Sequence, residues 1–319
     1  MAISCNSGTS AVNIAVGALN IGPGDEVIVP SYTFIATSFA VLQCGAIPVF
    51  CDTTEEHTID PAKIEALITK RTKAIIVVHL YGVVCDMDAI IAIARRHNLK
   101  VIEDSAQCLG GKYKGKLVGT IGDVGTFSFC QSKHFTTGGE GGMVVTNNPD
   151  IGWECRAYRD HGFDVKRKFD LLALEEVSWH VHNRIGYNYR MTEIQSIIGI
   201  NELERFDDWN MHNQIDLIHS LPLNSEDRQN GYWLYPIVFD LDKLDCTAEI
   251  ILRDLKEIEN YAVLALPISL SAPVSIHRLN RSITVILCVR LPVLYYPGQS
   301  ACICIPAGMK SISFIVLIS

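Results

Sequence analysis

The stretch AIIVVHLYGVVCDMDAIIAIARRHNLKVIED, residues 74–104, decides the fold class. It opens with a nearly continuous run of β-branched residues at 74–79, which is typical of a strand covered on both faces in a parallel sheet. A helix is predicted over Met87–His97 and a second strand over Leu99–Glu103. Strand, helix and strand in this order form a right-handed βαβ unit with parallel strands.

The same alternation continues on both sides of this unit. Short apolar runs predict further strands at residues 27–29, 48–51, 125–129 and 142–146. Helices are expected at residues 10–21, 34–44, 61–68 and 192–206, several of them bounded by Ser, Thr, Pro or Gly. The pattern predicts an α/β fold with a mostly parallel sheet between helices. Ligands of such folds bind at the carboxyl ends of the strands.

Composition narrows the class of protein. The chain has 319 residues, 48% hydrophobic and 19% charged, which suits one large domain and a smaller appendage. Its net charge of −8 argues against a nucleic-acid partner. The 11 cysteines form no CxxC pair, so we expect reduced thiols and no metal site. Neither a signal peptide nor a membrane-spanning stretch is evident, so we expect a cytoplasmic location without membrane contact.

The first candidate site is the small-residue cluster SGTS at residues 7–10, which opens a predicted helix. Backbone amides at a helix N-terminus, together with hydroxyl groups, bind anions such as phosphate. An ordinary helix cap explains the same residues, and taken alone it is the more common explanation.

The second candidate is the segment EDSAQ at residues 103–107, which ends a predicted strand. A carboxylate at this end of a strand can pair with the protonated ring nitrogen of a cofactor. A solvated turn acid or a helix cap explains the segment equally well.

The third candidate is Lys133, in the Gly-rich segment FSFCQSKHFTTGGEGG at residues 127–142. Desolvation in such a loop lowers the pKa of an amine and makes it a nucleophile. Ser128 is spaced to offer a hydroxyl to a phosphate. The alternative is a surface lysine in a flexible loop, which is the more common environment of a lysine.

The fourth candidate is GYNYRMTE at residues 186–193, which leads into a helix that Thr192 can cap. Asn188 and Arg190 have no evident local role, which leaves them for an interface or a ligand. The alternative is a polar loop.

In this order, the four candidates resemble the DegT/DnrJ/EryC1/StrS family of sugar aminotransferases, which depend on pyridoxal 5'-phosphate (PLP). Further matching strings are VIVPSYTFIAT (27–37), GAIPVF (45–50), HLYG (79–82) and EGGMVVT (140–146). The resemblance runs from about Ser4 to Phe206 and resumes more weakly over residues 232–255. It implies the aspartate-aminotransferase-like fold, PLP-transferase type I, with a seven-stranded-type sheet.

The resemblance also implies roles for single residues. Lys133 forms the Schiff base with PLP and later shuttles the proton, and Asp104 keeps the ring nitrogen protonated. The other implied cofactor contacts are Gly8, Thr9, Ser10 and Ser128 at the phosphate, Phe34 on the ring, Gln107 beside the ring, and Asn188 at the phosphate of the neighbouring subunit. Shared sites of this kind imply a homodimer. The implied substrates are a keto-sugar, linked to a nucleotide, and glutamate or glutamine as amino donor.

Three regions are expected along the chain. Residues 1–206 form the large PLP-binding domain, residues 207–259 form part of a small C-terminal α+β domain, and residues 260–319 form an atypical tail. The tail contains no Asp or Glu and loses periodicity, and poor order is one interpretation of it. Against the family pattern, the chain lacks several dozen residues before the Ser-Gly-Thr element, so it reads as truncated at the N-terminus with an aberrant tail.

Three functions stay open at this point. The first is transamination through Lys133. The second is dehydration on the same scaffold, which some relatives perform with a histidine at the lysine position, so the lysine favours transamination. The third is an inactive or regulatory PLP-binding remnant, which the truncated start and the tail favour.

Overall fold

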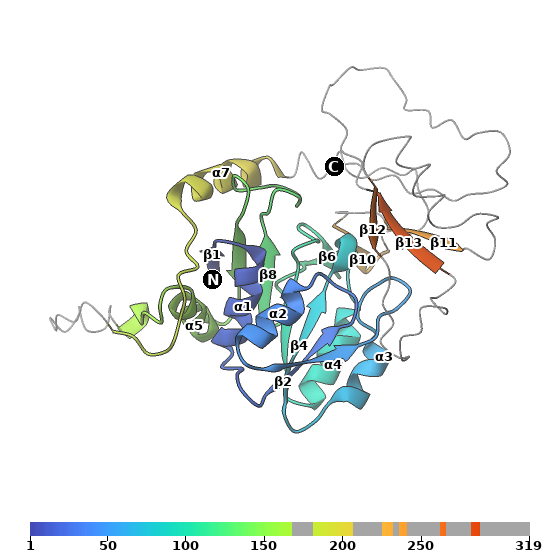
Figure 1. Cartoon of the computed structure of the whole chain (residues 1–319), viewed down its shortest axis with the longest axis horizontal. Coiled ribbons are helices and arrows are strands. Elements are labelled where there is room, and N and C mark those ends of the chain that lie inside the picture. The colour runs from blue at the N-terminus through green and yellow to red at the C-terminus, as the bar shows by residue number, and fades with distance from the viewer. Residues whose placement is uncertain (168–180, 207–224, 232–235, 241–261, 266–281, 288–319) are drawn as a thin grey trace, which may run out of the picture. The chain divides into compact units, whose positions relative to one another are not determined.

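A computed structural model describes residues 1–167, 181–206 and 225–231, and the backbone of residues 236–240, 262–265 and 282–287 (Figure 1). The chain divides into two compact units, Met1–His212 with Asn224–Trp233, and Asn213–Leu223 with Leu234–Ser319. The first unit carries every site residue that the sequence predicts. The predicted domain boundaries at residues 206 and 259 stay predictions.

The first unit contains a seven-stranded sheet in the order β1-β9-β8-β5-β4-β2-β3. Its strands are β1 (Ala2–Cys5), β2 (Glu26–Pro30), β3 (Ile47–Cys51), β4 (Thr72–Val78), β5 (Lys100–Asp104), β8 (Val124–Ser128) and β9 (Gly142–Val145). The pairs from β8 to β3 are all parallel, and β9 runs opposite to both of its neighbours. The predicted α/β fold with a mostly parallel seven-stranded sheet is therefore confirmed.

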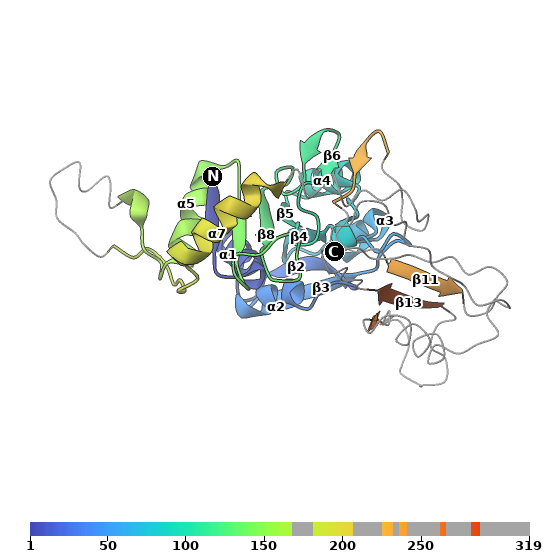
Figure 2. The same ribbon diagram turned by 90° about the horizontal axis from the view of Figure 1, so that it is seen from above.

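Helices cover both faces of this sheet, and Figure 2 shows α2 and α4 on opposite sides of the central strands. The helices are α1 (Gly8–Ala18), α2 (Ala36–Gln43), α3 (Pro61–Ile64), α4 (Met87–Arg96), α5 (Pro149–Arg159) and α7 (Glu193–Glu204). Side chains that accept a hydrogen bond from the first turn cap α1, α3, α4, α5 and α7, namely Ser7, Asp60, Asp86, Asn148 and Thr192. Of the helices that the structure describes, none is long and apolar enough to cross a bilayer.

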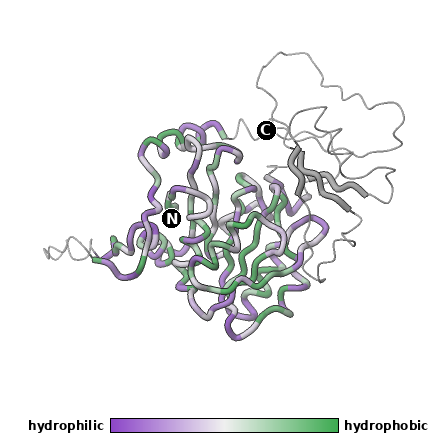
Figure 3. The backbone as a smooth tube through the Cα atoms, in the orientation of Figure 1, coloured by the Kyte–Doolittle hydropathy of each residue, from purple (hydrophilic) through white to green (hydrophobic). Residues whose placement is uncertain are grey.

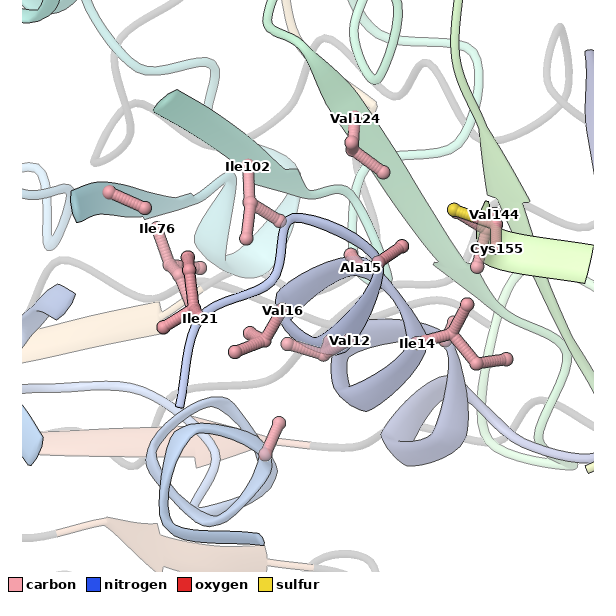
Figure 4. Close-up of a cluster of buried hydrophobic side chains, with 14 of the residues drawn as sticks. Val12, Ile14, Ala15, Val16, Ile21, Ile76, Ile102, Val124, Val144 and Cys155 are labelled. Carbon is pink, nitrogen blue, oxygen red and sulfur yellow. The ribbon is translucent and has the colours of Figure 1, made fainter. Parts of the chain in front are cut away.

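The strands are apolar on both faces because alternate side chains enter two different cores. Ala74 and Ile76 of β4 join the core around α1, whereas Ile75 and Val77 join the core around α4. Figure 4 shows the α1 core, and the tube in Figure 3 is hydrophobic along the central strands. Each fully buried isoleucine contributes on the order of 1.5–3 kcal/mol. This packing fixes α1 against the sheet and so positions its N-terminus.

Several short elements carry too little sequence signal to predict. They are β1, the 3-10 turn Leu80–Gly82, and the small sheet of β6 (Lys112–Tyr113), β7 (Lys116–Leu117) and β10 (Arg228–Gln229). The helix predicted at 61–68 consists of α3 and a 3-10 turn over Glu65–Leu67. The sequence reading also omits α5, although the Asn-Pro start of that helix is a recognisable signal.

The second unit contains an antiparallel sheet in the order β11-β13-β12. Its strands are β11 (Pro236–Asp240), β12 (Ala262–Ala265) and β13 (Ser282–Leu287). The first of these lies within the predicted small domain, residues 207–259, and the other two fall within the predicted tail.

Candidate active site

The candidate site lies at the carboxyl ends of two neighbouring strands. Asp104 is the last residue of β5 and Ser128 is the last residue of β8, and these two strands are paired in parallel. Both side chains therefore lie at one edge of the sheet. This is the edge at which α/β folds bind their ligands.

Asp104 is buried, with 7% of its surface exposed. Its Oδ2 accepts a hydrogen bond from the Thr37 hydroxyl at 3.1 Å, and its Oδ1 accepts one from the Ala106 amide at 3.2 Å. Burial raises the pKa of Asp104, and the Ala106 amide, the Thr37 hydroxyl and the nearby Lys133 offset part of this rise. The carboxylate is thus partly solvated by the protein and gains from any cation placed beside it.

Lys133 is half-buried in the loop between β8 and β9. Burial lowers the pKa of Lys133 to about 8, and the Asp104 carboxylate is the largest opposing influence. The two groups act on each other electrostatically, which places the predicted amine and the predicted acid in one site. At pH 7 about a tenth of the amine is neutral, whereas an ordinary lysine is almost entirely charged.

The loop that carries Lys133 is held in shape on both sides of the lysine. The rings of Phe129 and Phe135 are stacked, with centroids 4.8 Å apart. The Gln131 amide donates to the Gly139 carbonyl at 2.9 Å. His134 Nε2 lies 2.9 Å from the Gly231 carbonyl and must donate to it, and burial lowers the pKa of His134 to about 4. A neutral histidine therefore sits next to the amine and adds no competing charge.

The start of α1 forms a cradle beside these groups. Ser7 caps the helix by accepting from the Ser10 amide at 3.1 Å. A Cβ atom at Gly8 would lie 2.8 Å from Ser128 Oγ, and one at Gly142 would lie 2.9 Å from the Gly8 amide nitrogen. Only glycine allows backbone and hydroxyl to come this close. The cradle offers helix N-terminal amides and a hydroxyl, which are donors suited to a phosphate.

Three further predicted residues lie in or near this site. The Gln107 side-chain oxygen accepts from the Tyr81 amide at 2.8 Å, which leaves its NH₂ group as the donor toward a ligand. Phe34 is 66% exposed, one helical turn before Thr37, whose hydroxyl contacts Asp104. The Ser10 hydroxyl lies 2.7 Å from Asn6 Oδ1 and so serves the helix cap.

Asn188 lies on an exposed loop beside α5. Its backbone forms an antiparallel bridge with Asp160. The next residue, Tyr189, accepts a hydrogen bond from the Asn6 amide at 2.9 Å, which brings this loop next to the start of α1. The described contacts of Asn188 do not join it to Lys133, and its reach toward a neighbouring subunit stays a prediction.

A cluster of three rings at the same edge was not predicted. Tyr32, His57 and Tyr81 follow β2, β3 and β4, and the hydroxyls of Tyr32 and Tyr81 are 2.5 Å apart. Tyr81 has φ of 58°, a left-handed conformation that costs a non-glycine residue about 1 kcal/mol or more. The signal in the sequence was the HLYG string, which marks a turn immediately after a buried strand.

A second unpredicted feature is the buried pair of His79 and Glu103, both with no exposed side-chain surface. The Cys85 amide donates to His79 Nδ1 at 3.1 Å, so the ring proton is on Nε2, which lies 3.2 Å from Glu103. Glu103 also accepts from the Gly119 and Gly122 amides at 2.8 and 2.6 Å. These contacts hold β4, β5 and the following loop together behind Asp104.

The donor set suits PLP, which needs an amine for its aldehyde, a carboxylate for its ring nitrogen and a cradle for its phosphate. All three groups occur together at the edge of this sheet. Within the part of the chain that the structure describes, no three His, Cys, Asp or Glu side chains are grouped so that they could hold a metal ion.

Comparison with known proteins agrees with this chemistry. Residues 1–221 match the profile of the DegT/DnrJ/EryC1/StrS aminotransferase family. Over 208 residues, 65% of this chain and 53% of the relative, the chain is 51% identical to the GDP-perosamine synthase of Caulobacter vibrioides. Over 199 residues, 61% of this chain and 50% of the relative, it is 48% identical to a UDP-N-acetyl-3-dehydro-alpha-D-glucosamine 3-aminotransferase of Acidithiobacillus ferrooxidans. The chain thus spans about half the length of these curated relatives.

Solved structures show the same fold. An aminotransferase from Psychrobacter cryohalolentis aligns with a TM-score of 0.73 and 38% identity, covering 82% of this chain and 72% of that one. DesV of S. venezuelae, solved with a ketimine intermediate, aligns with a TM-score of 0.72 and 31% identity, covering 90% and 78% of the two chains. The chain therefore belongs to the DegT/DnrJ/EryC1/StrS aminotransferase family, as its motifs predicted.

Proposed function

We propose that this protein is a PLP-dependent aminotransferase that moves an amino group from glutamate or glutamine to a keto-sugar linked to a nucleotide. The observation that carries the proposal is that Asp104 and Ser128 end two neighbouring parallel strands beside the cradle of α1, with Lys133 in the loop that follows Ser128. We also propose a cytoplasmic location, because the cysteine pattern indicates reduced thiols.

The roles of the residues follow from their environments. When bound, PLP supplies an aldehyde that combines with amines and a ring that withdraws electrons. The partly neutral amine of Lys133 would bond to the aldehyde carbon of the cofactor with loss of water, and once a substrate amine has replaced it there, it would carry a proton to and from a substrate carbon. Asp104 would hold a proton on the ring nitrogen of the cofactor, because that pair of charges would offset the burial of the carboxylate.

The remaining predicted residues orient the cofactor. Gly8, Thr9 and Ser128 would hold the phosphate, with Ser10 maintaining the helix start behind them. Phe34 would cover one face of the ring. All of these residues belong to the first unit.

The substrate class is supported by the relatives. The names of the two relatives described above refer to sugars linked to GDP and UDP. A third relative is a dTDP-3-amino-3,4,6-trideoxy-alpha-D-glucose transaminase of Streptomyces venezuelae, 40% identical over 210 residues. A sugar linked to a nucleotide is common to these names, and the keto form of such a sugar is what an aminotransferase can aminate.

We propose that the protein acts as a homodimer, because α7 presents an apolar stripe to solvent. The side chains of Ile194, Ile197, Ile200 and Leu203 are 57–74% exposed. The other side of α7 contacts the lysine loop, since Gln195 donates to the Glu140 carbonyl at 2.9 Å. A second copy covering the stripe would thus lie close to the catalytic loop. Light scattering should show a dimer that Ile197→Asp with Ile200→Asp dissociates and that Leu117→Asp, at an exposed site on β7, leaves intact.

A regulatory PLP-binding protein is the second candidate. A "Pleiotropic regulatory protein" of Geobacillus stearothermophilus is 44% identical over 208 residues, and the matched region again spans 52% of that relative. Such a protein would bind PLP without turning over a sugar.

A cofactor titration separates these functions. The purified full chain with PLP should gain an absorption band at the border of the visible and ultraviolet, which Lys133→Ala abolishes and the exposed-site control Lys116→Ala retains. Glutamate or glutamine should then discharge the band, and a panel of nucleotide-linked keto-sugars should restore it. A band without turnover supports the regulatory candidate, and no band contradicts both.

A further inference from the structure

We propose that Thr37, with Thr33 behind it, is a positioning residue that holds the Asp104 carboxylate in place for the cofactor ring. The inference rests on the proposed function and deepens it. It assigns a task to the first turn of α2, which lies 67 residues before Asp104 in the chain.

The hydrogen bonds have only one possible direction. Thr37 is fully buried, and its Oγ1 lies 3.1 Å from Asp104 Oδ2. An ionised carboxylate can only accept, so the Thr37 hydroxyl donates its single proton to Asp104. The Thr33 hydroxyl, 3.2 Å away, must then donate to Thr37. The chain runs from Thr33 through Thr37 to Asp104, and the first donor strengthens the second.

The hydroxyl of Thr37 has no structural task in its own helix. The N-terminus of α2 has no side-chain cap, and the Thr37 amide donates to the Phe34 carbonyl. The hydroxyl instead reaches out of α2 to another element. A valine would fill the same volume without the hydrogen bond.

The other groups that face Asp104 cannot replace this contact. Ala106 donates from the backbone to Oδ1, and the His79 amide donates to the Asp104 main-chain oxygen at 3.1 Å. The titratable groups nearby are Lys133, which acts on Asp104 through its charge, and the His79 ring, which is neutral because its Nδ1 accepts from the Cys85 amide. Among the described residues, Thr37 thus supplies the side-chain hydrogen bond to Oδ2, and each carboxylate oxygen keeps one lone pair for a ring nitrogen.

The test compares Thr37→Val, Thr37→Ser and Thr33→Val in the full chain. The Asp104 pKa is measured without cofactor by the pH titration of its ¹³C-labelled carboxyl carbon, with the resonance assigned through Asp104→Asn. A hydrogen bond to a charged group is worth one to two pKa units, so Thr37→Val should raise the pKa by about that much. Thr37→Val should also weaken PLP binding by about tenfold, because the same hydrogen-bond energy no longer supports the carboxylate in the complex.

Thr37→Ser should restore both values to near those of the parent, because serine keeps the donor. Thr33→Val should shift the pKa by less than Thr37→Val does, because the direct contact survives. If a Thr37→Val protein with an unchanged melting temperature keeps the parent pKa and PLP affinity, or if Ser fails to restore them, the inference is wrong. If the parent chain binds no PLP, the proposed function fails, while the pKa titration still decides the Thr37 contact.

Discussion

Glu103 and Asp104 follow each other at the end of β5, yet they occupy opposite environments. Glu103 accepts hydrogen bonds from the His79 ring and from the amides of Gly119, Ile121 and Gly122. Burial would raise the pKa of Glu103, but these donors outweigh burial and lower it. Asp104 has two donors, and burial raises its pKa.

The difference separates a structural acid from a functional one. Successive side chains of a strand point to opposite faces, so one acid enters the loop packing and the other the ligand edge. The protein supplies hydrogen-bond donors to the carboxylate of Glu103, and these donors stabilise its charged form. The carboxylate of Asp104 is short of partners, which makes it the one that a protonated ring nitrogen would stabilise.

The largest expected effect is on catalysis at Asp104. Asp104→Asn keeps the shape of the side chain but cannot balance a protonated ring nitrogen. We expect kcat/KM for transamination to fall by about a thousandfold, which corresponds to about 4 kcal/mol of lost transition-state stabilisation. Steady-state kinetics with glutamate measure this. A loss of less than tenfold would mean that Asp104 does not face the cofactor.

The next effect is on stability at Glu103. Glu103→Gln turns one acceptor oxygen into an NH₂ donor that faces backbone N–H groups. We expect the free energy of unfolding at pH 7 to fall by about 3 kcal/mol. Urea denaturation of the cofactor-free protein measures this loss. Asp104→Asn in the same assay should be neutral or stabilising, and equal losses in the two variants would erase the distinction between the acids.

Relative to the parent, the free energy of unfolding should change with pH in opposite directions for the two variants. The folded pKa of Glu103 is lowered, so its stabilisation is fully present above the ordinary value of 4.5 and is lost as the pH falls through the folded pKa. The folded pKa of Asp104 is raised, so ionising it opposes folding above the ordinary value of 3.8. The deficit of Glu103→Gln should shrink on acidification, and any gain from Asp104→Asn should shrink as well.

Sequence reasoning reached the fold but could not separate these acids. The βαβ pattern of residues 74–104 needs only local periodicity, and helix caps such as Thr192 are equally local, so both were confirmed. Nothing local distinguishes Glu103 from Asp104. Apart from the Ala106 amide, their partners lie 16–67 residues away, from Gly119 to Thr37. The family resemblance pointed to Asp104, whereas the partners required the folded chain.

The smallest expected effect is on the pH profile of cofactor association, which the Asp104 charge sets through the pKa of Lys133. A neutral amine attacks PLP, so the rate of cofactor association should rise about tenfold per pH unit below the Lys133 pKa of about 8 and level off above it. Because the Asp104 charge raises the pKa of Lys133, Asp104→Asn should shift the plateau to lower pH. Stopped-flow absorbance measures both profiles.

Glu103→Gln provides the matched control for this shift. Glu103 is not among the groups that alter the pKa of Lys133, so removing its charge should leave the midpoint of the rate profile in place. The variant would be assayed at a temperature where it remains folded. A midpoint that moves equally in both variants would indicate a general loosening of the lysine loop instead of a specific pairing of Asp104 with the amine. A shift confined to Asp104→Asn would identify the second of the two adjacent acids as the one that sets the reactivity of Lys133.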